Sequence, residues 1–247
     1  MTTMLQAPKS RWGRALFRFD ARRRLEGAFS RCLVAGLPSL AALLESGPAI
    51  VAMNHVSFWD GFLLPCLEHE LGADAYCLMD GANLAELSFL RFAGALSLDR
   101  TNVHRARADL QRAARVLDRP GRLLFVFPSG EQAPARFPLR FLSGVSCLAQ
   151  LARVPVVPAG LAYEFLGDAK PEIRVSIGPA VSLVHQSLAN RRRLQQAVRV
   201  ELDRIDASLV ADGAAIAPAF APLFRERPRG IPTGARLLGR LTRGRST

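Results

Sequence analysis

Residues 48 to 60 of the chain read Pro48-Ala49-Ile50-Val51-Ala52-Met53-Asn54-His55-Val56-Ser57-Phe58-Trp59-Asp60. The apolar run that ends at Met53 is typical of a buried β-strand. Ser57, with Asp60 three residues later and apolar residues beyond it, is typical of the start of a helix. A buried strand that passes through a short turn into a helix is the building unit of an α/β fold.

His55 and Asp60 lie on either side of this turn. An unperturbed histidine titrates at about 6.5, so it can accept a proton near neutral pH once a carboxylate fixes its tautomer and orientation. Residues five apart in one helix point roughly 140° away from each other, so the two side chains meet only if His55 precedes the helix. The pattern predicts a general base, His55, with Asp60 as its orienting partner. The alternative is that Asp60 caps the helix and His55 is an ordinary turn residue.

Strands and helices alternate along the rest of the chain, which predicts an α/β layer fold with a largely parallel sheet flanked by helices. The 247 residues, 49% of them hydrophobic, suffice for one core and hence one catalytic domain. We expect strands at residues 32–35, 49–53, 75–79, 96–98, 123–127, 154–158 and 173–177. We expect helices at residues 58–71, 82–90, 105–117, 144–152 and 188–210. The longest apolar segment, Cys32 to Leu44, is too short to span a membrane.

The net charge of +12 is concentrated at the two ends of the chain. Residues 1–31 hold eight Lys or Arg against two acidic residues, and residues 225–247 hold seven Arg against Glu226. The remaining residues hold eighteen basic and eighteen acidic side chains, so the catalytic body is formally neutral. Basic ends on a neutral body point to an acidic surface as partner. We therefore divide the chain into a basic amphipathic segment (1–31), a catalytic domain (32–211) and a basic flexible tail (212–247).

The N-terminal segment contains Trp12, Leu16 and Phe19 at helical spacing among several arginines. This composition is typical of a helix that lies in a membrane interface, and each basic residue near an anionic bilayer contributes about 1 kcal/mol. The alternative is that the apolar stripe packs onto the body of the protein. Charged residues throughout 9–24 do not fit a secretory signal. No zinc-finger spacing, RNA-binding block or basic zipper accompanies the charge, so we do not expect a nucleic acid partner.

Several other kinds of site are not expected from the sequence. The remaining histidines lack ligand spacing, so we predict no metal, and no dinucleotide or nucleotide loop occurs. The cysteines are scattered in apolar surroundings, which is typical of small core residues in a reducing compartment. The residues concerned are His69, His104, His185, Cys32, Cys66, Cys77 and Cys147.

Four blocks of this sequence, in order, resemble the signature blocks of the glycerophospholipid acyltransferases, the family of the 1-acylglycerol-3-phosphate acyltransferases. The blocks are Asn54 to Asp60, Gly94 to Arg100, Phe125 to Glu131 and Val154 to Gly160. The resemblance implies transfer of an acyl group from acyl-CoA or acyl carrier protein to a hydroxyl of a lysophospholipid, by an enzyme on the cytoplasmic face of the membrane. His55 would act as general base and Asp60 would orient it, without an acyl-enzyme or a cofactor. The sequence Gly144-Val145-Ser146 is not completed to a nucleophile elbow, because Leu148 replaces the closing glycine.

The third block departs from the family pattern Phe-Pro-Glu-Gly-Thr-Arg, because Ser129 precedes the glycine and Gln132 stands where the arginine is usual. An arginine there would suit an acceptor phosphate, since a guanidinium offers two parallel donors to phosphate oxygens. A lipid acceptor without phosphate, such as a glycolipid or a carotenoid glycoside, is therefore an alternative, as is an inactive lipid-binding module or a thioesterase. The residues expected to bind substrate are Asn54, Ser57, Arg100, Gly130, Glu131, Arg136 and Arg140.

Three of these residues also have structural interpretations. Glu131 could hydrogen-bond an acceptor hydroxyl or form a salt bridge with Arg100. Arg136 and Arg140 could replace the missing arginine of the third block or lie in a solvated loop.

Overall fold

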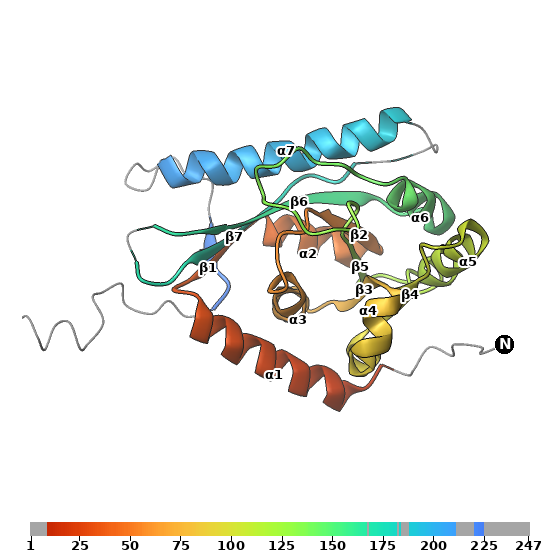
Figure 1. The fold of residues 1–247 in the computed structure, drawn as a ribbon, viewed down its shortest axis with the longest axis horizontal. Helices are drawn as coiled ribbons and strands as arrows, with labels where there is room; N and C mark the ends of the chain where they lie inside the picture. The colour runs from red at the N-terminus through yellow and green to blue at the C-terminus, as the bar shows by residue number, and fades with distance from the viewer. Residues whose placement is uncertain (1–8, 167, 182, 184–187, 211–219, 225–247) are drawn as a thin grey trace, which may run out of the picture.

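The computed structural model describes residues 9–166, 168–181, 183, 188–210 and 220–224. Within these residues eight strands form one sheet, in the order β4-β3-β5-β2-β6-β7-β1-β8 (Figure 1). The strands are β1 (Cys32–Ala35), β2 (Ala49–Met53), β3 (Asp74–Asp80), β4 (Ala95–Leu98), β5 (Arg122–Val126), β6 (Val156–Glu164), β7 (Glu172–Ile177) and β8 (Ala221–Pro222). Neighbours from β4 to β6 are parallel, as are β7 and β1, whereas β6·β7 and β1·β8 are antiparallel. The predicted α/β fold with a largely parallel sheet is confirmed.

Helices cover both faces of the sheet. They are α1 (Arg11–Ala28), α2 (Leu37–Ser46), α3 (Asp60–Glu70), α4 (Gly81–Glu86), α5 (Val103–Ala114), α6 (Gly144–Ala152) and α7 (Leu188–Val210), with a 3-10 helix, η1 (Ser88–Ala93). Figure 1 shows α7 along one side of the molecule and α1 along the opposite side. No helix among the described residues is both long enough and apolar enough to cross a membrane.

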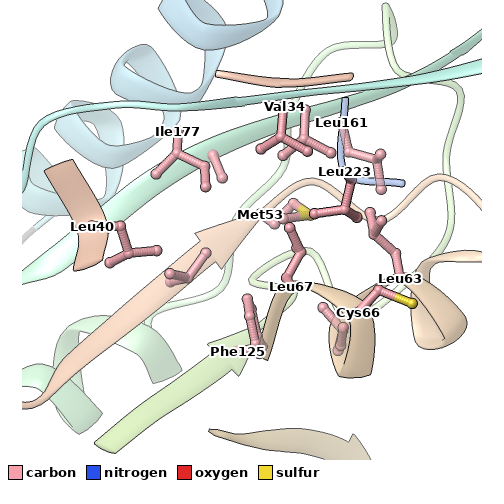
Figure 2. Packing of buried hydrophobic residues seen from close by; sticks show 14 of the residues in the cluster. Val34, Leu40, Met53, Leu63, Cys66, Leu67, Phe125, Leu161, Ile177 and Leu223 are labelled. Atoms are coloured by element: carbon pink, nitrogen blue, oxygen red, sulfur yellow. The ribbon is translucent and has the colours of Figure 1, made fainter. Parts of the chain in front are cut away.

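The core explains why β2 is apolar at every position. Successive side chains of a strand point to opposite faces of the sheet. Val51 and Met53 pack with α2 and α3 in one cluster, part of which Figure 2 shows, and Ile50 and Ala52 pack with α5, α6 and α7 in another. A strand with helices on both faces is buried on both faces, so its sequence is a continuous apolar run and not an alternating one.

The fold brings several strand ends to one edge of the sheet. The parallel strands β2, β3, β4, β5 and β6 all end there, and ligand sites of α/β sheets collect at such carboxyl edges. His55 follows β2, Asp80 ends β3, Arg100 follows β4 and Phe127 follows β5. Four of the five strand ends therefore contribute a side chain to one cavity, and the sequence predicted two of these side chains, His55 and Arg100, as site residues.

Two expectations are corrected by the fold. The segment before β2 contains a helix, α2, which begins after Gly36 in a left-handed conformation and has a proline in its first turn. Part of the predicted flexible tail is ordered, because β8 pairs with β1 and Leu223 and Phe224 are buried in the core. The rest of the predicted tail, apart from residues 220–224, lies outside the described residues.

The expected N-terminal helix is present as α1, which packs against α3. The side chain of Ser10 caps the helix by accepting a hydrogen bond from the N–H of Gly13. Ala21 and Leu25 of α1 are buried, whereas Trp12, Leu16 and Phe19 of the same helix are 87%, 71% and 69% exposed. The described part of the helix thus buries one stripe against the body and leaves a second apolar stripe at the surface.

Candidate active site

The predicted base and carboxylate are in contact. Nδ1 of His55 lies 2.7 Å from Oδ2 of Asp60. His55 lies on the turn that follows β2, and Asp60 is the first residue of α3. The expected start of this helix is shifted by two residues, because Ser57 to Trp59 form a turn before it. The two side chains therefore meet across this turn, as the sequence predicted for a histidine that precedes the helix.

Asp60 is completely buried and its charge is stabilised by hydrogen bonds. Oδ2 accepts a bond from the N–H of Val56 at 2.7 Å, and both oxygens accept from the N–H of Ser57 at 3.2 Å. An ionised carboxylate can only accept hydrogen bonds, so Nδ1 of His55 carries the proton and Nε2 offers its lone pair. This is the tautomer that a general base needs.

Tyr163, at the end of β6, supplies a further donor to Asp60. Its hydroxyl donates to Oδ1 at 2.7 Å, and its ring lies 5.3 Å from that of Phe29. Burial, followed by the charge of Asp60, raises the pKa of Tyr163 well above its usual value, so the phenol keeps its proton. Sequence reasoning missed this residue, because a tyrosine in an apolar strand is usually a core residue and the contact joins positions 103 apart.

Asn54 holds the turn after β2 against β6. Its side-chain amide donates to the carbonyl of Leu161 and accepts from the N–H of the same residue, both at 2.8 Å. With 3% of its surface exposed and both ends of its amide bonded to β6, Asn54 does not line the cavity. The expectation of substrate binding is therefore corrected to one of positioning. Ser57 is also engaged locally, since its hydroxyl accepts from the N–H of Trp59 at 3.3 Å.

A cavity of about 650 Å³ opens at His55. Its wall is mostly apolar and includes Phe17 from α1, Phe62 from α3, Leu78 from β3 and Leu90 from η1. The ring of Phe127 stacks on His55 with 4.3 Å between centroids. A largely apolar cavity with a few polar groups beside a base is the usual form of a small-molecule site.

Arg100 reaches the cavity next to the third block. Its Nε donates to Oδ2 of Asp80 at 2.8 Å, and both residues line the cavity. Gly130 has a φ of +70°, which favours glycine, and a Cβ at this position would displace the end of the Arg100 side chain. Sequence reasoning missed Asp80, although an acidic residue directly after an apolar strand is a recognisable signal.

Three expected site residues do not reach the cavity. Arg136 instead pairs with Glu164 at 2.9 Å and with Asp206 at 2.7 Å, which fastens its loop to β6 and α7. Arg140 and Glu131 are exposed, and neither lines the cavity wall. The expected placement of these three residues at the acceptor site is therefore corrected, and Arg100 pairs with Asp80 and not with Glu131.

Cys77 is a candidate nucleophile by position, because it lies in the cavity wall. Burial raises the pKa of its thiol to about 12. A thiol attacks as its thiolate, so Cys77 is almost entirely unreactive at neutral pH. Among the described residues no group of three His, Cys, Asp or Glu side chains is arranged to hold a metal ion.

The geometry can be compared with known proteins. A search of curated proteins finds no match. Among solved structures, the chain is similar to the 1-acyl-sn-glycerophosphate (LPA) acyltransferase PlsC from Thermotoga maritima, with a TM-score of 0.56 and 18% sequence identity. The similarity covers 78% of this chain and 80% of that one, and it shows a shared fold. The sequence model of the family described as Acyltransferase matches residues 35–162, more than half of the chain, and this chain therefore belongs to the acyltransferase family.

Proposed function

We propose that the protein transfers a fatty acyl group from an acyl thioester, acyl-CoA or acyl carrier protein, to a hydroxyl of a single-chain lipid. The observation that carries this proposal is the His55–Asp60 pair at the mouth of an apolar cavity. Both acceptor classes expected from the sequence fit this description: a lysophospholipid such as 1-acylglycerol-3-phosphate, and a lipid without phosphate such as a glycolipid.

The chemistry follows from the position of the proton. Nε2 of His55 accepts the proton of the acceptor hydroxyl while the oxygen attacks the thioester carbonyl carbon. The carbon–sulfur bond then breaks, and the leaving thiolate takes the proton back from the imidazolium. Asp60 stays ionised throughout and stabilises the imidazolium, as the carboxylate of a catalytic triad does. The high pKa of Cys77 supports direct attack without an acyl-enzyme.

The direct test is acyl transfer from a labelled thioester to a lipid extract. We expect His55→Ala to abolish transfer, and Asp60→Asn to reduce it by about 10³- to 10⁴-fold, because an asparagine amide favours the wrong tautomer. His104→Ala removes an exposed histidine of α5 and serves as the control. Full activity of a folded His55→Ala protein would exclude this mechanism. Acyl release that does not depend on a lipid acceptor would indicate a thioesterase, and no turnover at all a lipid-binding module.

We also propose that the protein binds the cytoplasmic face of an anionic membrane peripherally through α1. Trp12, Leu16 and Phe19 follow each other at intervals of four and three residues and form one exposed ridge. Exposed arginines such as Arg11 and Arg23 accompany this ridge. A helix with an apolar ridge and basic flanks suits a bilayer interface. Phe17 and Arg24 of the same helix line the cavity, so docking of α1 would bring the cavity to the lipid.

Vesicle sedimentation tests this arrangement. Burial of an apolar side chain contributes about 1.5 to 3 kcal/mol. We therefore expect Trp12→Ser, Leu16→Ser and Phe19→Ser together to weaken binding to anionic vesicles by about 100-fold or more. The control combines Val103→Ser and Phe165→Ser, which remove exposed apolar side chains that do not belong to α1. Equal binding by both variants would refute the role of the ridge.

A further inference from the structure

The cationic group nearest the third block is already neutralised. The Arg100 guanidinium donates to Asp80 at 2.8 Å and packs over Gly130, where a side chain would displace it. The second oxygen of Asp80 accepts from the N–H of Ala82 at 3.0 Å, so this carboxylate also caps α4. The side chain of Arg100 is therefore held in an ion pair that is built into the start of a helix.

Asp80 remains charged under the conditions of catalysis. The hydrogen bond from Arg100 is the main cause that holds the pKa of Asp80 below its usual value. At neutral pH the carboxylate is ionised, and its charge cancels that of the guanidinium at contact distance. A phosphate that approached Arg100 would also approach Asp80, and like charges at this distance repel each other.

The other cations near the cavity are also paired. Arg24 lines the cavity on the side of α1 and donates to Asp20 at 2.6 Å. Arg136, a candidate to replace the family arginine, is held by Glu164 and Asp206. At the family position itself stands Gln132, which lines the cavity and carries no charge. Each arginine that lines the cavity in the described part of the chain thus has a carboxylate partner.

Three polar side chains that line the same cavity as His55 suit hydroxyls. Asp80 offers acceptor oxygens, and the amides of Asn83 and Gln132 each offer two donors and an acceptor. A phosphate monoester carries a charge of about −1.5 to −2 at neutral pH and needs cationic donors to replace its water. Hydroxyls of a glycerol or a sugar need hydrogen-bond partners of both kinds and no net charge.

We infer that the acceptor carries an uncharged polyhydroxy headgroup, a glycerol or a sugar, bound between Asp80, Asn83 and Gln132, and that lysophosphatidic acid is a poor acceptor. This assignment rests on the proposed acyl transfer and narrows its acceptor to one class. The Asp80–Arg100 pair acts as a specificity determinant, because it removes the charge that a phosphate would require.

The test compares acceptors of the same chain length in one assay. The purified full-length protein receives an acyl thioester together with a 1-monoacylglycerol, an alkyl glucoside or lysophosphatidic acid, and the acylated products are measured by mass spectrometry. We expect kcat/KM for at least one uncharged acceptor to exceed that for lysophosphatidic acid by about tenfold or more, which is the size of one lost charge-assisted hydrogen bond. A preference for lysophosphatidic acid would overturn the assignment. Loss of thioester to water with no acylated lipid would instead refute acyl transfer itself, and the acceptor assignment with it.

Two substitutions make the acceptor side of the cavity more positive and leave the His55 side chain unchanged. Gln132→Arg restores the family cation, and Asp80→Asn frees Arg100 while an asparagine still caps α4. Each is expected to shift the ratio of kcat/KM values toward lysophosphatidic acid by about tenfold. Gln111→Arg adds the same charge on the exposed side of α5 and should leave the ratio unchanged. If Asp80→Asn fails to fold, Gln132→Arg decides alone, and an unchanged ratio in that variant would contradict the assignment.

Discussion

The substitution Tyr163→Phe removes the phenol oxygen and with it the hydrogen bond from Tyr163 to Asp60. In the wild-type protein Oδ1 of Asp60 accepts from the phenol at 2.7 Å and otherwise only, among the described residues, from the N–H of Ser57 at 3.2 Å. The phenylalanine ring keeps the packing on Phe29. The variant therefore isolates the contribution of the hydroxyl to a buried carboxylate.

The expected loss follows from that geometry. A hydrogen bond to a charged group contributes about 1.5 to 3 kcal/mol to the free energy of unfolding. For a domain of this size, that corresponds to a fall in Tm of roughly 3 to 12 °C. With Oδ1 held by one long bond, the carboxylate aligns His55 less firmly. We expect kcat to fall by about ten- to hundredfold, with KM changed little, because small displacements of a catalytic group have effects of this size.

Two measurements separate a positioning role from a structural one. Urea unfolding gives the stability, and labelled acyl transfer gives kcat and KM on the same preparation at a temperature where both proteins are folded. Asp60→Asn provides the reference for complete loss of the charged partner. If Tyr163→Phe lost stability and kept the kcat of the wild type, the phenol would stabilise the folded protein without positioning His55. If neither changed, the hydrogen bond to Asp60 would have no measurable role.

Three further changes have expected outcomes. Gly160→Ala should destabilise the protein by about 1 to 3 kcal/mol in urea unfolding, because the new Cβ would lie 2.9 Å from the backbone of Glu201 in α7; unchanged stability would show that α7 can move away. Cys77→Ala should keep the rate of acyl transfer within about threefold of the wild type, because a thiol attacks as its thiolate and the thiolate fraction of Cys77 is negligible at neutral pH. Complete loss of transfer would instead support a covalent mechanism through Cys77. Burial raises the pKa of Asp74, but the hydrogen bond and charge of Lys9 outweigh it and leave this pKa below its usual value. The resulting stabilisation is present above the unfolded pKa of about 4 and is lost as the pH falls through the lower folded value, so Asp74→Asn should flatten the acid side of the stability profile measured between about pH 3 and pH 6; an unchanged slope would contradict this.

The sequence predicted the elements with strong local signals and missed those that depend on distant partners. The bounds of β2, α6 and α7 agree with the expected ranges, because each is a long apolar or amphipathic run between clear breaks. No helix was expected between residues 36 and 48, although a glycine before a helix and a proline in its first turn, here Gly36 and Pro38, mark a helix start.

The site shows the same division between local and distant information. His55 and Asp60 are joined by one turn, so their spacing predicts their contact. Arg136 was misplaced because its partners Glu164 and Asp206 come from elements that sequence spacing cannot bring together. Tyr163 was missed for the same reason. Its distance from Asp60 depends on how the strands pair in the sheet, and no local sequence pattern predicts that pairing.

The arrangement of the strand ends has a consequence for how such an enzyme can change. The proposed base and its carboxylate come from the turn after β2 and from α3, whereas the groups proposed to meet the acceptor come from the end of β3, from α4 and from the loop after β5. The side chains of Gln132 and Asp80 make no hydrogen bond to the His55 imidazole, which contacts Asp60, although the backbone N–H of Ala133 donates to the carbonyl of His55 at 2.9 Å. Under the proposed assignment, a change of acceptor preference needs no change in the side-chain contact between His55 and Asp60, so proteins with the same pair are expected to differ in the lipid that they acylate.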